Sequence, residues 1–153
     1  MIYPAAAVAN VFIETAAENG FFFTNLKLQK MVYFAHGWYL AFTDSPLISE
    51  DVQSWKYGPV IQALYNDLRH YGASPITHRI DIDVAVGKNS EDWNFIRAVY
   101  RKYAPFSPAQ LVAMTHRPGS PWDQFGAGQD DFQIIPNEAI KDYFKKMIPA
   151  NEQ

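Results

Sequence analysis

The most informative segment of the chain runs from residue 24 to residue 43 and reads Thr24-Asn25-Leu26-Lys27-Leu28-Gln29-Lys30-Met31-Val32-Tyr33-Phe34-Ala35-His36-Gly37-Trp38-Tyr39-Leu40-Ala41-Phe42-Thr43. Its length and composition are typical of an α-helix, and Thr24 can accept a hydrogen bond from an amide of the first turn. Apolar residues occupy most of its circumference. We therefore expect this helix to be buried at the centre, with other helices packed around it.

The whole chain has the composition of one ordinary globular domain. Its 153 residues are 48% hydrophobic and 19% charged, so we expect residues 1–153 to form a single domain stabilised by packing. The absence of cysteine excludes disulfides, thiolate zinc sites and cysteine catalysis. Because no signal peptide is visible at Met1, we expect a cytoplasmic location.

Charge and hydropathy bear on the kind of partner. The net charge is −3 and lysine and arginine form no run, so we do not expect a nucleic-acid partner. The central helix is too short, and too polar at its start, to span a bilayer, so we do not expect a membrane partner either.

Helix signals occur at six places along the chain. Besides residues 24–43, helices are expected from Pro4 to Asn19, from Pro59 to Tyr71, after Ser90 as far as Pro105, from Ser107 to Thr115, and from Pro136 onward. Ser107-Pro108-Ala109-Gln110 has the pattern of a capping box. Residues 116–133 are rich in glycine, proline and aspartate and are expected to form an irregular loop pinned by Trp122 and Phe125.

Two other segments have strand character. Residues 47–57 follow a turn signal and predict one or two short strands, and residues 76–86 alternate apolar and other side chains. Paired with each other, these segments would make a small antiparallel sheet beside the helices. The predicted fold class is therefore α+β, predominantly helical, with about six helices around the central one.

The sequence contains no recognisable catalytic or metal-binding motif. No nucleophile elbow, P-loop or dinucleotide fingerprint is present, and the histidines lack zinc-ligand spacing, so we expect neither a metal nor a cofactor. His36 is expected to be a hydrogen-bonded structural residue in the buried helix. His116, at the start of a loop and expected to be more exposed, is the best of four weak catalytic candidates. We do not expect an enzyme, and a small enzyme centred on His116 or His36 remains the alternative.

Aromatic residues are the unusual feature. The run Trp55-Lys56-Tyr57-Gly58-Pro59 ends a predicted strand, and Trp122 lies in the later loop. These rings could fill the gap between sheet and helices, or they could be exposed anchors for another protein, since tryptophan and tyrosine are enriched in interface hot spots. Lys27 and Lys30 could be solvated or could border the same contact surface. The residues predicted to contact a partner are Lys27, Lys30, Trp55, Lys56, Tyr57, Pro59 and Trp122.

The same residues carry a family resemblance. Residues 26–41, then Pro46-Leu47, residues 55–60, Tyr71-Gly72, Thr115-His116 and Pro121-Trp122, with Ile140 and Tyr143-Phe144, resemble the signature of the Panacea domain. That family includes SocA-like antitoxins and phage-associated GepA-type proteins. The resemblance covers nearly the whole chain and implies a mostly helical domain with a small β component.

The resemblance also implies a function. Panacea domains act as antitoxins that neutralise partner toxins by direct binding, and SocA-like members can deliver their toxin to a bacterial protease as adaptors. The first hypothesis is therefore an antitoxin with a cognate toxin as its partner, and with a protease as a second partner if it is also an adaptor. The alternative from the same resemblance is a phage-associated regulatory or adaptor protein that binds a host factor without a toxin.

Overall fold

A computed structural model of the chain describes residues 1–129 and 132–149. Its helices are α1 (Ala5–Glu18), α2 (Asn25–Thr43), α3 (Gln62–Leu68), α4 (Glu91–Tyr103), α5 (Pro108–Thr115), α6 (Pro121–Gln124) and α7 (Asn137–Lys146), with a 3-10 turn η1 (Arg69–Tyr71) after α3. The strands are β1 (Val52–Trp55), β2 (Gly58–Val60) and β3 (Gln133–Ile135). The predicted class, predominantly helical α+β, is confirmed.

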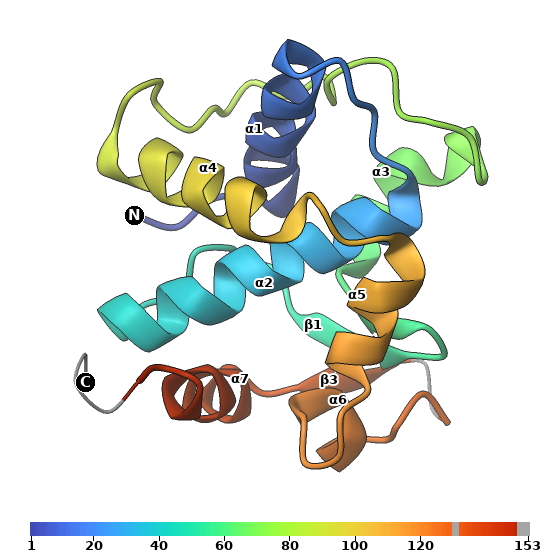
Figure 1. Cartoon of the computed structure of the whole chain (residues 1–153), viewed down its shortest axis with the longest axis vertical. Helices are drawn as coiled ribbons and strands as arrows, with labels where there is room; N and C mark the ends of the chain where they lie inside the picture. Colours follow the sequence, from blue (N-terminus) through green and yellow to red (C-terminus); the bar gives the residue numbers. More distant parts are fainter. Residues whose placement is uncertain (130–131, 150–153) are drawn as a thin grey trace.

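Helix α2 crosses the middle of the molecule, as predicted (Figure 1). Helices α1 and α4 pack on one side of it and on each other, α7 packs along the other side, and α5 contacts its N-terminal half. Sixteen of its 19 residues are buried. The Thr24 hydroxyl accepts from the Lys27 amide at the start of α2, which confirms the predicted cap.

The close contact between α2 and α7 depends on a glycine. A Cβ placed on Gly37 would lie 2.3 Å from the ring of Phe144. Phe144 is fully buried and packs edge-on against Tyr33, Phe34 and Trp38. Gly37 therefore lets α7 bring this ring onto the backbone of α2.

The sheet is antiparallel and its strand β1 lies in the expected segment 47–57, but the strands that pair with β1 are not the expected ones. Strand β1 lies between β2 and β3, with Trp55 opposite Gly58 and Val52 opposite Ile135. Lys56 and Tyr57 form the two-residue turn of the β1–β2 hairpin. The expected helix start at Pro59 is wrong, because residues 58–60 form β2 and helix α3 begins at Gln62.

The expected strand at residues 76–86 is wrong as well, since these residues form neither strand nor helix. Their backbone is held by other groups: the Ile76 amide donates to the carbonyl of Phe23 at 2.7 Å, and the Asn10 side chain makes two hydrogen bonds to the backbone of Ile80. Ile76 and Val86 are buried. Ile80 and Ile82 pack against the core as well, whereas Val84 is 47% exposed, and no strand of the described residues pairs with this segment.

Residues 116–133, expected to form an irregular loop, are not irregular throughout, and two of them, 130 and 131, lie outside the described residues. Helix α6 occupies part of this segment, with the Ser120 hydroxyl accepting from the Asp123 amide, and strand β3 begins at Gln133.

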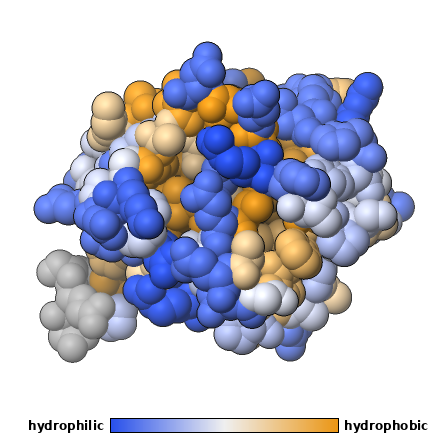
Figure 2. Space-filling model, turned by 90° about the horizontal axis from the view of Figure 1, so that it is seen from above, coloured by the Kyte–Doolittle hydropathy of each residue, from blue (hydrophilic) through white to orange (hydrophobic). Residues whose placement is uncertain are grey.

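Seen from above, the surface shows hydrophobic patches separated by hydrophilic side chains (Figure 2). No helix in the described part of the chain combines the length and apolar character that a membrane crossing requires.

Candidate functional site

The two lysines predicted to border a contact surface lie inside the protein. Lys27 is 5% exposed and Lys30 is 0% exposed, so the expectation that they are surface residues is wrong. Lys27 donates from Nζ to the carbonyl of Ala104 at 2.7 Å, where α4 ends, and its ammonium lies 4.7 Å from the centre of the Phe21 ring. A cation at the negative end of α4 is a favourable placement, while burial lowers the pKa of Lys27.

Gln29 and Lys30, both in α2, hold the β1–β2 hairpin through hydrogen bonds to its backbone and to the residue that follows it. The Gln29 side-chain oxygen accepts from the amide of Ile61 at 3.0 Å, between β2 and α3. Lys30 donates from Nζ to the carbonyl of Pro59 at 3.1 Å, and burial lowers the pKa of Lys30 to about 7. A buried ammonium is costly unless it is hydrogen-bonded, so this contact ties the position of β2 to α2.

Gly58 allows this close packing. Its φ of 114° lies in the region that favours glycine, and a Cβ there would lie 2.7 Å from Thr115 Oγ1 and 2.8 Å from Lys30 Cε. The glycine of the Trp-Lys-Tyr-Gly-Pro run is thus required by two side chains from helices far away in the sequence.

Trp122 also supports the hairpin. Its indole donates to the carbonyl of Trp55 at 2.6 Å, and its ring stacks on His116 at 3.7 Å between centroids. The amide of Gly128 donates to the hydroxyl of Ser54. These contacts fix strand β1 and its turn against the segment from α5 to β3.

His36 and His116, the two histidines considered as catalytic candidates, have different surroundings. The His36 ring contacts Asn137 Oδ1 through Nε2 at 2.9 Å and accepts from the Ile48 amide through Nδ1, which agrees with the structural role expected. Its pKa is lowered by burial. His116 is half-buried rather than exposed, and burial, with a smaller effect of the Lys30 charge, lowers its pKa. In the described residues no three side chains of the metal-ligating types come together.

Three of the five remaining predicted residues lie together at a groove of about 670 Å³ beside the hairpin. Trp55, Lys56 and Tyr57 line it, and Tyr57 is 57% exposed. Pro59 is buried beneath, and Trp122 acts as a support. The structure therefore divides the predicted set into groove residues (Trp55, Lys56, Tyr57) and residues that hold the hairpin or the helices (Lys27, Lys30, Pro59, Trp122).

The groove also contains residues that the sequence analysis did not single out. Leu26 comes from the start of α2, and Tyr65 and Arg69 come from α3 and η1. The rings of Tyr65 and Trp55 lie 5.0 Å apart. Tyr65 and Arg69 are four residues apart and lie off the buried stripe of Leu64 and Leu68, so helical periodicity could have placed them on one exposed face.

The outer face of the sheet continues this apolar surface. Ile134, opposite Gln53 in the register, is 48% exposed. Phe132 is 63% exposed, and its ring lies 6.1 Å from that of Trp55. Exposed apolar surface that is contiguous with an aromatic groove is typical of a protein-binding region.

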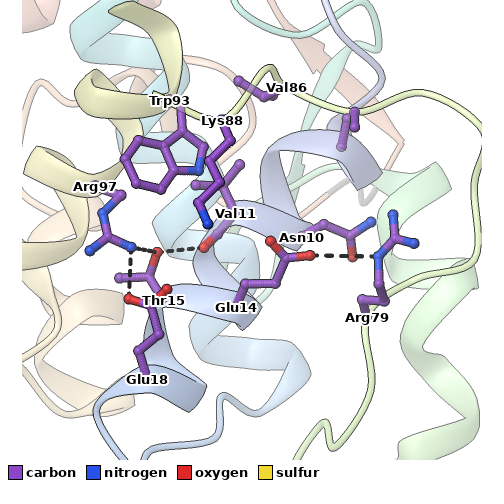
Figure 3. Close-up of a pocket in the computed structure, with 12 residues that line it drawn as sticks. Asn10, Val11, Glu14, Thr15, Glu18, Arg79, Val86, Lys88, Trp93 and Arg97 are labelled. Atoms are coloured by element: carbon purple, nitrogen blue, oxygen red, sulfur yellow. Dashed lines mark hydrogen bonds and ion pairs between the residues drawn. The ribbon is translucent and has the colours of Figure 1, made fainter. Parts of the chain in front are cut away.

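A second hollow, of about 130 Å³, lies between α1, α4 and the 72–90 loop and has a different character (Figure 3). Arg79 pairs with Glu14 at 3.6 Å, and Arg97 pairs with Glu18 at 3.0 Å while also donating to the Thr15 hydroxyl. The Arg97 guanidinium lies over the Trp93 ring. Both arginines are thus engaged in holding the loop and α4 against α1, and we interpret this hollow as structural.

Comparison with known proteins agrees with the resemblance seen in the sequence. The family model described as "Antitoxin SocA-like, Panacea domain" matches residues 28–123. The chain is 33% identical over 133 residues to Antitoxin SocA of Caulobacter vibrioides (strain NA1000 / CB15N), covering 81% of this chain and 71% of that protein. No solved structure matches the chain significantly. The matched region runs from α2 through the hairpin to Trp122, and the chain belongs to the SocA-like antitoxin family defined by the Panacea domain.

Proposed function

We propose that this protein is the antitoxin of a toxin–antitoxin pair and that it neutralises its toxin by direct protein–protein binding. The observation that carries the proposal is the similarity to Antitoxin SocA over 81% of the chain. The groove beside the hairpin supports it, because exposed aromatic side chains on a rigid support are the usual material of a protein-binding surface. We further propose that residues 1–153 act as one domain in the cytoplasm, a compartment compatible with a chain that has no cysteine.

Co-expression with the product of the adjacent gene tests the proposal. Induction of that gene alone should arrest growth, and co-induction of this chain should relieve the arrest. The two purified proteins should then elute together on gel filtration. The control is an unrelated toxin. Co-induction of this chain should not relieve the growth arrest that the unrelated toxin causes. Unrelieved arrest together with separate elution would disprove the proposal.

A proteolytic-adaptor role is a finer part of the same proposal. An antitoxin that only occupies its toxin leaves the amount of toxin unchanged, whereas an adaptor shortens the lifetime of the toxin. Pulse-chase labelling of the toxin with and without this chain separates the two. An unchanged toxin lifetime would leave neutralisation by binding as the mechanism and exclude the adaptor role.

A further inference from the structure

We infer that the groove beside the β1–β2 hairpin binds an apolar segment of the toxin that carries carboxylate side chains. The inference rests on the proposed antitoxin function and names the surface and the partner chemistry. It starts from the charge of the groove, which is opposite in sign to that of the whole protein. The net charge of the chain is −3, yet the charged side chains lining the groove within the described residues are Lys56 and Arg69.

Two helix ends add to this positive character. Helix α2 begins at the groove with Thr24 and Asn25, and α5 begins there with Pro108. Neither helix has an acidic residue in its first turn. The positive ends of these two helix dipoles add to the two cations, and Arg69 offsets the negative end of the α3–η1 segment, which also lies at the groove, so a partner carboxylate would find favourable potential near Lys56 and the two helix starts.

The floor and rim of the groove supply the apolar contact. Trp55 is half-buried, Tyr57 is 57% exposed and Leu26 is 38% exposed. Tyrosine and tryptophan provide large contact areas with few rotatable bonds, so ordering them on binding costs little entropy. An apolar side chain of the partner would thus bury contact area against these residues, while acidic residues beside it in the partner reach Lys56 and Arg69.

The groove is held in shape before any partner arrives. The carbonyl of Trp55 accepts from Trp122, and the carbonyl of Pro59 accepts from Lys30. These two hydrogen bonds anchor the strands that flank Lys56 and Tyr57, and preorganisation of this kind lowers the cost of binding. Lys30 and Trp122 therefore contribute to binding by holding the groove in shape, without touching the partner.

A nucleic acid fits this surface less well than a protein does. Two cations on an acidic protein provide little neutralisation of a phosphate backbone, whose binding depends on several such contacts. The aliphatic residues Leu26, Val60 and Pro108 in the lining offer no hydrogen bonds to bases. We therefore assign the groove to a protein segment, and an oligonucleotide is included in the test.

The test uses the full chain and the purified product of the adjacent gene. Binding affinity is measured for the wild type, for Lys56→Glu/Arg69→Glu and for Tyr57→Ala. The matched control is Lys88→Glu/Arg101→Glu, which makes the same change of charge at exposed residues outside the groove. Circular dichroism and thermal unfolding establish that each variant folds, and a fluorescent single-stranded oligonucleotide is titrated as a competitor.

We expect both groove variants to weaken binding by at least about tenfold, and the control pair by less than about twofold. The wild-type affinity should fall with added salt, and this dependence should be smaller in the Lys56→Glu/Arg69→Glu variant. Undiminished binding by folded groove variants would overturn the inference while leaving the antitoxin function intact. Competition by the oligonucleotide would overturn it in favour of nucleic acid. Absence of any complex with the wild type would overturn the proposed function and the inference together.

Discussion

Lys30 donates from its buried ammonium to the carbonyl of Pro59 at 3.1 Å, so a charge in the interior holds the hairpin that carries the groove. Burial lowers the pKa of Lys30 from its ordinary value of 10.5 to about 7. Between these two values the unfolded chain binds more protons than the folded protein does. The free energy of unfolding should therefore rise as the pH rises.

We predict this pH dependence for the wild type and its absence in Lys30→Met. Between pH 7 and 9 the free energy of unfolding should rise by up to about 1.4 kcal/mol per pH unit more in the wild type than in the variant. Urea denaturation at fixed pH values measures it. Lys146→Met, at an exposed position, should keep the wild-type slope. Parallel curves for the wild type and Lys30→Met would show that Lys30 keeps its ordinary pKa.

Gly58→Ala should destabilise the protein by about 2–4 kcal/mol, since it combines a positive φ with a clash against Thr115 and Lys30. Gly20→Ala is the matched control, because Gly20 also has a positive φ, 72°, but nothing lies within 4 Å of its added Cβ. That variant should lose only about 1 kcal/mol. If Gly58→Ala and Gly20→Ala lose the same free energy of unfolding in denaturant, Thr115 and Lys30 move aside for the added methyl group at no cost.

Asn10→Ala should loosen the loop that sequence patterning had suggested as a strand. Asn10 accepts from the Ile80 amide at 2.6 Å and donates to the Ile80 carbonyl at 2.9 Å, and its loss leaves both groups unpaired. Hydrogen exchange at Ile80 and tryptic cleavage after Arg79 should both become faster. Asn19→Ala, which removes a hydrogen bond to the Thr15 carbonyl at the end of α1, away from Ile80, should leave both rates near those of the wild type.

Sequence reasoning worked best where structure is decided locally. Thr24 and Ser107 were correctly predicted as helix caps, because a cap depends on residues within one turn. The aromatic run Trp55-Lys56-Tyr57 was also singled out, because its residues stand together in the sequence, but the sequence predicted the end of a strand there and not a hairpin turn. The mostly helical class followed from the periodicity of the long helices.

Reasoning from sequence failed where the deciding partner is distant. Strand β3 is three residues long and pairs with β1 across about eighty positions, so no local pattern marks it. Lys27 and Lys30 have the polarity of surface residues, and their acceptors, the carbonyls of Ala104 and Pro59, become visible only in the fold. Both lysines were therefore expected at the surface although they are buried, and Tyr65 and Arg69, which line the groove, were not singled out.

Gly37→Ala tests the packing of α7 on the central helix. The added methyl would lie 2.3 Å from Phe144, whose ring cannot move aside because Tyr33, Phe34 and Trp38 surround it. We expect a loss of about 3 kcal/mol, measured by denaturant unfolding.

A double-mutant cycle with Phe144→Leu identifies the cause of that loss. The smaller side chain makes room for the methyl group, so the double variant should lose clearly less stability than the two single variants added together. The matched control combines Phe144→Leu with Ala35→Gly. Ala35 lies on α2, as Gly37 does, and is fully buried, but Gly37 is the residue whose added Cβ would meet the Phe144 ring. Additive losses in the Gly37 cycle would show that α7 shifts as a body to accept the methyl group, and the two helices would then be less rigidly joined than the packing indicates.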